Sequence, residues 1–377
     1  MIPYGRQCLD EDDIQAVVEV LRSDWLTTGP KVREFEEAFA EYVGAKYAVA
    51  VSSGTAALHS AMYAIDIGPG DEVIVPPMTF ASTANCVVFQ GGTPVFADVD
   101  PDTLLIDPAQ VGARIRPNTK AIIAVDYAGQ PCEYDELRKI ARQNGIRLVA
   151  DGCHALGAEY KGQKVGTLAD VTVFSFHPVK HITTGEGGAA TTDDGKLAQR
   201  MRLFRSHGIM SDYSQREAQG TWYYEMVDLG YNYRITDIQC ALGLSQLKKL
   251  PAFLARRREI AARYNEVLRQ IKGIEPLKVR DSVQHAYHLY VVRIVKEQCG
   301  KDRAQVFKTL RDAGIGANVH YVPVHLHPFY RNRFSTDPGL CPVANEIYRH
   351  IISLPMHPSL SEADMERVID VLRSIAD

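Results

Sequence analysis

The sequence contains no CxxC pair, because its seven cysteines stand singly along 377 residues. Small secreted proteins that depend on disulfide bonds carry an even set of cysteines in a closely spaced framework. The odd count and the length of the chain favour reduced thiols instead. We therefore expect a cytoplasmic protein.

Charge of one sign is not in excess, and long hydrophobic runs are missing. Lysine and arginine number 42 against 46 aspartates and glutamates, which leaves a net charge of -4. This balance predicts no nucleic-acid partner, whose phosphates would require a basic surface. No apolar run approaches membrane-spanning length, and the first residues, MIPYGRQCLDEDD, lack the apolar stretch of a signal peptide. We expect no membrane partner.

The composition that remains, 46% hydrophobic and 23% charged, is that of an ordinary globular protein. A chain of 377 residues is too long to fold around one small hydrophobic core, so two domains are expected. Short β-branched runs alternate with helical patterns through the first part of the chain. This alternation is typical of an α/β fold in which helices cover a mostly parallel central sheet. The expected strands are residues 47–51, 72–75, 94–97, 121–125, 147–150 and 171–176.

The helical patterns carry recognisable ends. Asp10 is expected to cap a helix over 10–23, and Gly44 to end the next one. The first of these helices has one apolar face, formed by Ile14, Val17, Val18 and Leu21. Further helices are expected after SSGTAAL up to Ile65, and over 83–89 and 134–143.

The pattern changes after Thr236. A long helical stretch covers 242–268, with Pro251 as an expected kink or break. A strand over 289–294 and helices over 303–313 and 363–374 follow. These elements predict a smaller α+β domain, so that the chain divides into a large domain, 1–245, and a small C-terminal domain, 246–377.

Polar side chains gather where the expected strands end. Ser53, Asp151 and Ser175 all follow buried strands, and ligands bind at the carboxyl edge of such sheets. Lys180 lies between a buried strand and a glycine-rich turn, HITTGEGGA. Desolvation lowers the pKa of an ammonium group and makes the amine nucleophilic, which suits Schiff-base chemistry.

Each of these signals has a plainer interpretation. A single loop lysine is usually solvated, and an aspartate at a strand end often caps a turn. The segment SSGTAAL, residues 52–58, suits a phosphate-binding helix start, but most such turns bind nothing. It also lacks the glycine spacing of a dinucleotide fingerprint or a Walker loop.

Taken in order, eight segments give the chain a family resemblance over essentially its whole length. The segments are SSGTAAL, PPMTFASTAN, VDYAGQPCE, DGCHALGAEY, FSFHPVKHITTGEGGA, LFRSHG, GYNYRITDIQCALGLSQL and NVHYVPV. Together they resemble the sugar aminotransferases of the DegT/DnrJ/EryC type, which are fold-type-I enzymes dependent on pyridoxal 5'-phosphate. Within that family the chain looks most like the aminotransferase of the pseudaminic acid pathway.

The resemblance implies a role for each matching residue. Lys180 would form the Schiff base and move the proton, and Asp151 would pair with the pyridinium nitrogen. Phe80 would stack on the cofactor ring, although a core position suits a phenylalanine equally. Gly54, Thr55 and Ser175 would hold the phosphate. Asn232 would reach that phosphate from a neighbouring subunit, which implies a homodimer with shared active sites.

Other assignments concern the substrates and one departure from the family pattern. His154 stands where many relatives carry glutamine near the phenolic oxygen of the cofactor. The resemblance places His320 and Tyr321 at the sugar site, together with N-terminal residues: Tyr4, Asp24, Trp25, Leu26 and Thr27. No metal is expected, because neither His177 with His181 nor His325 with His327 is completed by further ligands at a recognised spacing.

The expected reaction transfers an amino group from L-glutamate to carbon 4 of a UDP-linked 4-keto-6-deoxy N-acetylamino sugar. A branch of the family that dehydrates at carbon 3 carries histidine in place of the lysine, so Lys180 argues against it. Aminotransferases that act on other keto sugar nucleotides, such as those that form GDP-perosamine, share the same catalytic residues. These substrates remain open as alternatives. A sugar-nucleotide-binding regulator without turnover is a further alternative.

Overall fold

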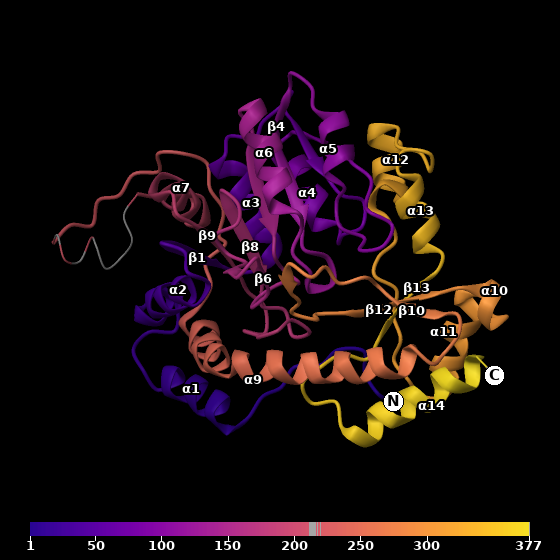
Figure 1. Ribbon diagram of the computed structural model, residues 1–377. Coiled ribbons are helices and arrows are strands. Elements are labelled where there is room, and N and C mark those ends of the chain that lie inside the picture. Colours follow the sequence, from indigo (N-terminus) through magenta and orange to yellow (C-terminus); the bar gives the residue numbers. More distant parts are fainter. Residues whose placement is uncertain (211–215, 217, 219, 377) are drawn as a thin grey trace.

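The computed structural model describes residues 1–210, 216, 218 and 220–376. A seven-stranded sheet lies at its centre, in the order β1-β9-β8-β5-β4-β2-β3 (Figure 1). Only β9 runs against its neighbours among these strands, so the mostly parallel sheet is confirmed. The strands are β1 Tyr47–Val51, β2 Glu72–Val75, β3 Thr93–Phe96, β4 Thr119–Val125, β5 Arg147–Asp151, β8 Val171–Ser175 and β9 Gly188–Thr192.

Helices connect the strands and cover the sheet, as the alternating pattern predicts. Gly44 takes the left-handed conformation that ends α2, with φ of 80°. The helices are α2 Pro30–Val43, α3 Gly54–Ala64, α4 Ser82–Phe89, α5 Pro108–Arg114, α6 Tyr134–Asn144 and α7 Gly195–Arg205.

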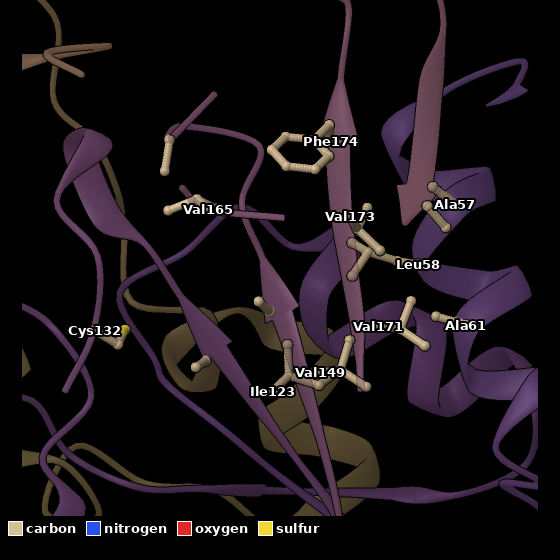
Figure 2. Packing of buried hydrophobic residues seen from close by; sticks show 14 of the residues in the cluster. Ala57, Leu58, Ala61, Ile123, Cys132, Val149, Val165, Val171, Val173 and Phe174 are labelled. Atoms are coloured by element: carbon tan, nitrogen blue, oxygen red, sulfur yellow. The ribbon is translucent and has the colours of Figure 1, made fainter. Parts of the chain in front are cut away.

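Strand β8 shows how the two faces of the sheet are packed. Val171 and Val173 point toward Leu58 and Ala61 of α3 (Figure 2). Phe174 points to the opposite face, because successive side chains of a strand alternate. There its ring lies 5.2 Å from that of Phe39 on α2. The β-branched run is therefore buried between two helices, which is why it contains no polar residue before Ser175 except Thr172.

The buried side of the first helix differs from the prediction. Helix α1, Glu11–Leu21, is capped by Asp10 as expected, but Ile14 and Leu21 are exposed, and Asp13 is buried. Asp13 accepts a hydrogen bond of 2.8 Å from Gln246 and pairs with Lys249 at 2.9 Å, both on α9. Polar pairing with α9, not the apolar stripe, thus orients this helix.

Helix α9, Asp237–Leu268, continues through Pro251 without interruption, so of the two expected effects of this proline, a kink or a break, the break is wrong. Proline removes one backbone hydrogen bond of a helix, and packing on both sides of the residue compensates for it. Leu250 and Leu254 are buried in the core beneath the large sheet. Ile260, Tyr264 and the residues that follow belong to a second core.

This second core lies between the distal half of α9 and a three-stranded antiparallel sheet (Figure 1). The sheet consists of β10 Ile274–Pro276, β12 Tyr290–Ile294 and β13 Ile351–Leu354. Helices α10 Lys296–Cys299, α11 Arg303–Asp312 and α14 Glu362–Ala376 accompany it. Helices α12 Pro328–Phe334 and α13 Pro342–Tyr348 contribute instead to the core of the large sheet. The boundary between 245 and 246 stays a prediction.

Three two-residue strands form a small separate sheet in the order β11-β6-β7. They are β6 Glu159–Tyr160, β7 Gln163–Lys164 and β11 Val283–Gln284. Over the described ranges, no helix combines the length and the hydropathy needed to cross a membrane.

Candidate active site

The carboxyl ends of β1, β5 and β8 lie at one edge of the sheet, as predicted. In the ladder, Gly188 of β9 pairs with Val51 on one side and with Ser175 on the other. This register brings the turn at Ser53 and Gly54 next to Ser175. The turn opens α3, and Ser53 caps the helix by accepting a hydrogen bond of 3.0 Å from Ala56 N–H.

Two glycines allow this close approach. A Cβ at Gly54 would lie 2.9 Å from Ser175 Cβ, and one at Gly188 would lie 2.6 Å from the carbonyl of Ser53. The first N–H groups of a helix have no acceptor within the helix and carry the positive end of its dipole. The start of α3, with half-buried Thr55 and Ser175 beside it, forms a cradle whose N–H and hydroxyl donors would suit a phosphate.

Replacing Gly188 by alanine should disrupt this cradle. The added methyl group would clash with the backbone of Ser53 and Gly54, which cannot move aside as a flexible side chain could. We expect the affinity for pyridoxal phosphate to fall by about tenfold or more, which corresponds to overpacking of about 1–3 kcal/mol. Equilibrium titration of the cofactor measures this, with Gly112→Ala on α5 as a control, because a Cβ at Gly112 would have no other heavy atom within 4 Å. Unchanged affinity in the Gly188 variant would contradict the assignment of the cradle.

Asp151 ends β5 and is buried, with 5% of its surface exposed. Its Oδ2 accepts a hydrogen bond of 2.7 Å from Thr83 Oγ1, and its Oδ1 accepts one of 3.2 Å from Cys153 N–H. Thr83 in turn lies 2.7 Å from Thr79 Oγ1. A buried carboxylate with donors on both oxygens is held in one orientation, ready to pair with a cation.

Lys180 is half-buried on the segment that follows β8. Its Nζ lies 3.4 Å from Nε2 of His288. Desolvation lowers the pKa of the Lys180 amine, and the charges of Cys153 and Asp151 offset this only in part. The fraction of neutral, nucleophilic amine is therefore raised, as the sequence predicts.

Three neutral histidines surround the lysine. The rings of His154 and His288 are 4.3 Å apart, and those of His181 and His288 are 5.7 Å apart. Burial lowers the pKa of each of these imidazoles well below its usual value, and the nearby Lys180 lowers it further. His181 Nε2 lies 3.1 Å from the carbonyl of Ala286.

Aromatic residues form one wall of the site. Phe80 is 60% exposed, which rules out the alternative of a core position. Its ring lies 6.1 Å from that of Tyr321, whose hydroxyl lies 3.0 Å from His154 Nε2. The ring of His320 is 5.3 Å from that of Tyr4. The structure thus brings Tyr4, His320 and Tyr321 together beside His154.

The other predicted contacts come from two further segments of the chain. Asp24, Leu26 and Thr27 are exposed and Trp25 is half-buried. Asp237 at the start of α9 fixes the end of this loop by accepting hydrogen bonds of 2.7 and 2.9 Å from the backbone of Gly29 and Lys31. Asn232 is exposed, and a backbone bridge joins it to Ser206.

The comparisons with known proteins agree with this geometry. The model of the DegT/DnrJ/EryC1/StrS aminotransferase family matches residues 7–373. The chain belongs to this family. It is 43% identical to the spore coat polysaccharide biosynthesis protein SpsC of Bacillus subtilis, across 99% of this chain and 97% of that protein.

Solved structures of other aminotransferases superpose on nearly the whole chain. PseC of Helicobacter pylori, an aminotransferase of pseudaminic acid biosynthesis, has a TM-score of 0.92 at 36% identity and covers 100% of this chain and 99% of its own. Spr1654 of Streptococcus pneumoniae, in its pyridoxamine phosphate form, has a TM-score of 0.94 at 34% identity, with coverage of 100% and 99%. Its pyridoxal phosphate form is similarly close, with a TM-score of 0.93.

The protein is thus a fold-type-I aminotransferase dependent on pyridoxal phosphate. Its own residues fit this cofactor. The glycine cradle leaves room for the phosphate, Asp151 offers a carboxylate, and the buried Nδ1 of His154 has no hydrogen-bond partner among the described residues. That orphaned nitrogen is suited to the phenolic oxygen. For metals, the described part of the chain holds no suitable group of three or more ligating side chains.

Two residues of the site were not predicted from the sequence. Thr83 lies within the quoted segment PPMTFASTAN, and His288 within AYHLYVV, far from the other motifs. A threonine inside a helix and a histidine before a strand give no local signal. Only the fold reveals that they contact Asp151 and Lys180.

Proposed function

We propose that this aminotransferase moves an amino group from L-glutamate to carbon 4 of a UDP-linked 4-keto-6-deoxy N-acetylamino sugar. The product would be UDP-4-amino-4,6-dideoxy-N-acetyl-β-L-altrosamine, the intermediate of pseudaminic acid biosynthesis. The observation that supports this substrate is the similarity of the whole chain to PseC, at 36% identity. A second candidate, another keto sugar nucleotide, is supported by the greater identity to SpsC, at 43%.

The chain's residues divide the work of this reaction. When bound, pyridoxal phosphate supplies an aldehyde that accepts the amino group and a ring that takes up electrons. Asp151, fixed by Thr83 and Cys153, would pair with the ring nitrogen and keep it protonated. Lys180 anchors the cofactor and then, as a free amine, takes a proton at Nζ from the donor's α-carbon. It returns a proton in the second half of the cycle.

Tyr4, His320 and Tyr321 are proposed to bind the sugar. They lie on the side of the site that His154 borders, and the Tyr321 hydroxyl can donate to a sugar oxygen or to His154. Burial raises the pKa of the Tyr321 hydroxyl far above its usual range, so this group remains a donor at neutral pH.

A substrate panel tests the proposed sugar. UDP- and GDP-linked 4-keto sugars are offered with L-glutamate, and 2-oxoglutarate formation is measured for each. We expect the UDP-linked N-acetylamino sugar to give the highest kcat/KM, by about 10²-fold or more over the GDP-linked sugars. Initial rates should show the parallel double-reciprocal lines of ping-pong kinetics. Preference for a GDP-linked sugar would replace the first candidate by the second.

We further propose that two chains share each active site, with Asn232 of one chain at the phosphate bound by the other. The segment leading to Asn232 carries exposed apolar side chains, which single chains seldom display in such density. They are Met210, Trp222, Tyr223, Tyr224, Met226, Val227, Leu229 and Tyr231. Exposed Ile14 and Leu21 of α1 add to the apolar surface that a partner would cover.

Co-expression of two inactive variants tests this arrangement. Lys180→Ala and Asn232→Ala chains, made together, should form mixed dimers with one intact site. About a quarter of the wild-type activity should then return, because half of the dimers are mixed and each has one of two sites. If Asn232 acted within its own chain, mixed dimers would contain no intact site, and activity would stay at the level of the separate variants.

A further inference from the structure

His288 is placed to act on Lys180, although it belongs to no segment of the family resemblance. Its Nε2 lies 3.4 Å from Lys180 Nζ, and its side chain is 4% exposed. The ring packs between His154 and His181. Its Nδ1 is buried without a hydrogen-bond partner among the described residues. Among the described residues, the Lys180 amine is the one hydrogen-bond partner of this imidazole.

The backbone that carries His288 is fixed from two sides. Arg257, fully buried, donates from Nη1 to the carbonyls of Tyr287 at 3.0 Å and His288 at 3.4 Å. On the other side, the N–H groups of Ala286 and Leu289 donate to the carbonyls of Gly129 at 2.9 Å and Ala128 at 3.1 Å. The imidazole is thus held by the scaffold and not by a mobile loop.

We propose that His288 is a positioning residue, whose neutral Nε2 accepts a hydrogen bond from the Lys180 amine whenever that amine is not bonded to the cofactor. The proposal rests on the role of Lys180 proposed above. Each half-reaction must release Lys180 as a free amine in a desolvated site, and a buried amine without a partner is unfavourable. An acceptor for one of its N–H groups leaves the lone pair free to take up a proton.

A neutral acceptor suits this task better than a carboxylate. A carboxylate beside Lys180 would favour the ammonium form, which has no lone pair. Burial keeps the imidazole of His288 neutral, because its pKa is well below the usual value. Nε2 can accept only in the tautomer that carries its proton on Nδ1. Asp151 lies near enough to influence the lysine, but the Lys180 amine makes its hydrogen bond within the described chain to His288 and not to this carboxyl group.

The test follows how the full chain, freed of cofactor, bonds to added pyridoxal phosphate. Rapid mixing measures the rate of bond formation at increasing cofactor concentrations. The half-saturating concentration reports phosphate binding. The limiting rate at saturation reports the placement of the Lys180 amine. Bond formation joins Lys180 nitrogen to the cofactor aldehyde and releases water. Borohydride reduction and peptide mapping then identify the labelled lysine.

We expect His288→Leu to lower the limiting rate about tenfold, as the loss of one positioning hydrogen bond implies, with the half-saturating concentration unchanged. His288→Gln, whose amide oxygen reaches the position of Nε2, should recover the rate to within about threefold. His288→Asn, which is too short, should behave like the leucine variant. His325→Leu removes a buried imidazole whose nitrogens have no hydrogen-bond partner among the described residues, and it should leave the rate unchanged.

Two results would overturn the proposal. One is a wild-type limiting rate in both the leucine and asparagine variants. The other is an equal loss of limiting rate in the glutamine and asparagine variants, whose side chains have the same polarity but different lengths. This comparison remains informative if the leucine variant does not fold. A reduced label on a lysine other than Lys180 in the wild-type chain would instead contradict the proposed role of Lys180, independently of His288.

Discussion

Replacement of Lys180 by alanine should lower turnover by about 10⁴-fold or more and leave the fold intact. The loss combines the anchoring bond and the proton transfer at Nζ, and positioned acid–base groups alone contribute about 10²–10⁴-fold. The fold should persist, because Lys180 is half-buried and its amine makes one long hydrogen bond within the described residues, to His288 at 3.4 Å. Steady-state assays and thermal unfolding measure the two quantities.

Lys161→Ala is a suitable control for this variant. Lys161 is an exposed lysine that pairs with Asp135 at 2.5 Å, and exposed ion pairs contribute little to stability. Both variants should unfold within a few degrees of the wild type. Turnover close to wild type in the Lys180 variant would refute the proposed mechanism.

Replacement of Asp151 by asparagine should reduce turnover by about 10³-fold without preventing cofactor binding. Asparagine matches the shape of aspartate but carries no charge, so it cannot keep the ring nitrogen protonated. A charge-assisted hydrogen bond is about twice as strong as a neutral one, and here it also sets the electron affinity of the ring. Single-turnover rates with L-glutamate measure the effect on the donor half-reaction directly.

Thr83→Val separates the charge of Asp151 from its orientation. Valine removes the hydrogen bond of 2.7 Å to Oδ2 and leaves the carboxylate and its bond to Cys153 N–H in place. We expect a loss of about tenfold, far smaller than that of the asparagine variant. Losses of equal size in the two variants would show that orientation, and not charge, is what Asp151 provides.

The strands of the sheet could be predicted where their sequences give a clear strand signal. Runs such as Val171–Ser175 consist of β-branched and aromatic residues because both faces are buried, and their polar ends mark the carboxyl edge. Strand β9 was missed, because its sequence, GAATT, is made of small residues that give no strand signal. Its glycine is required by the turn at Ser53, a constraint that only the assembled sheet reveals.

Tertiary contacts overrode local patterns in two helices. The apolar stripe of α1 predicted the wrong buried side, since Asp13 meets Gln246 and Lys249 of α9, more than 230 residues away in sequence. Pro251 predicted a break in α9 that packing of the neighbouring leucines overcomes. No single-sequence pattern contains such long-range pairings.

The site residues also fall into those that a local motif predicts and those that only the folded chain reveals. Lys180, Asp151 and the cradle at Gly54 could be named from motifs, since Asp151 and Gly54 mark the ends of buried strands and Lys180 lies between a buried strand and a glycine-rich turn. Thr83 and His288 could not, because their roles depend on neighbours 68 and 108 residues away. The roles of Asp24–Thr27 and Asn232 stay predictions until a second chain is placed beside the first.

The visible absorption spectrum of the purified protein, recorded before and after addition of L-glutamate alone, tests the central claim most directly. We expect the yellow band of lysine-bound pyridoxal phosphate to bleach with the release of one 2-oxoglutarate per site, and to return when 2-oxoglutarate is added in excess. The Lys180→Ala chain should show no such cycle. A wild-type band that persists unchanged in L-glutamate would contradict the proposed donor half-reaction.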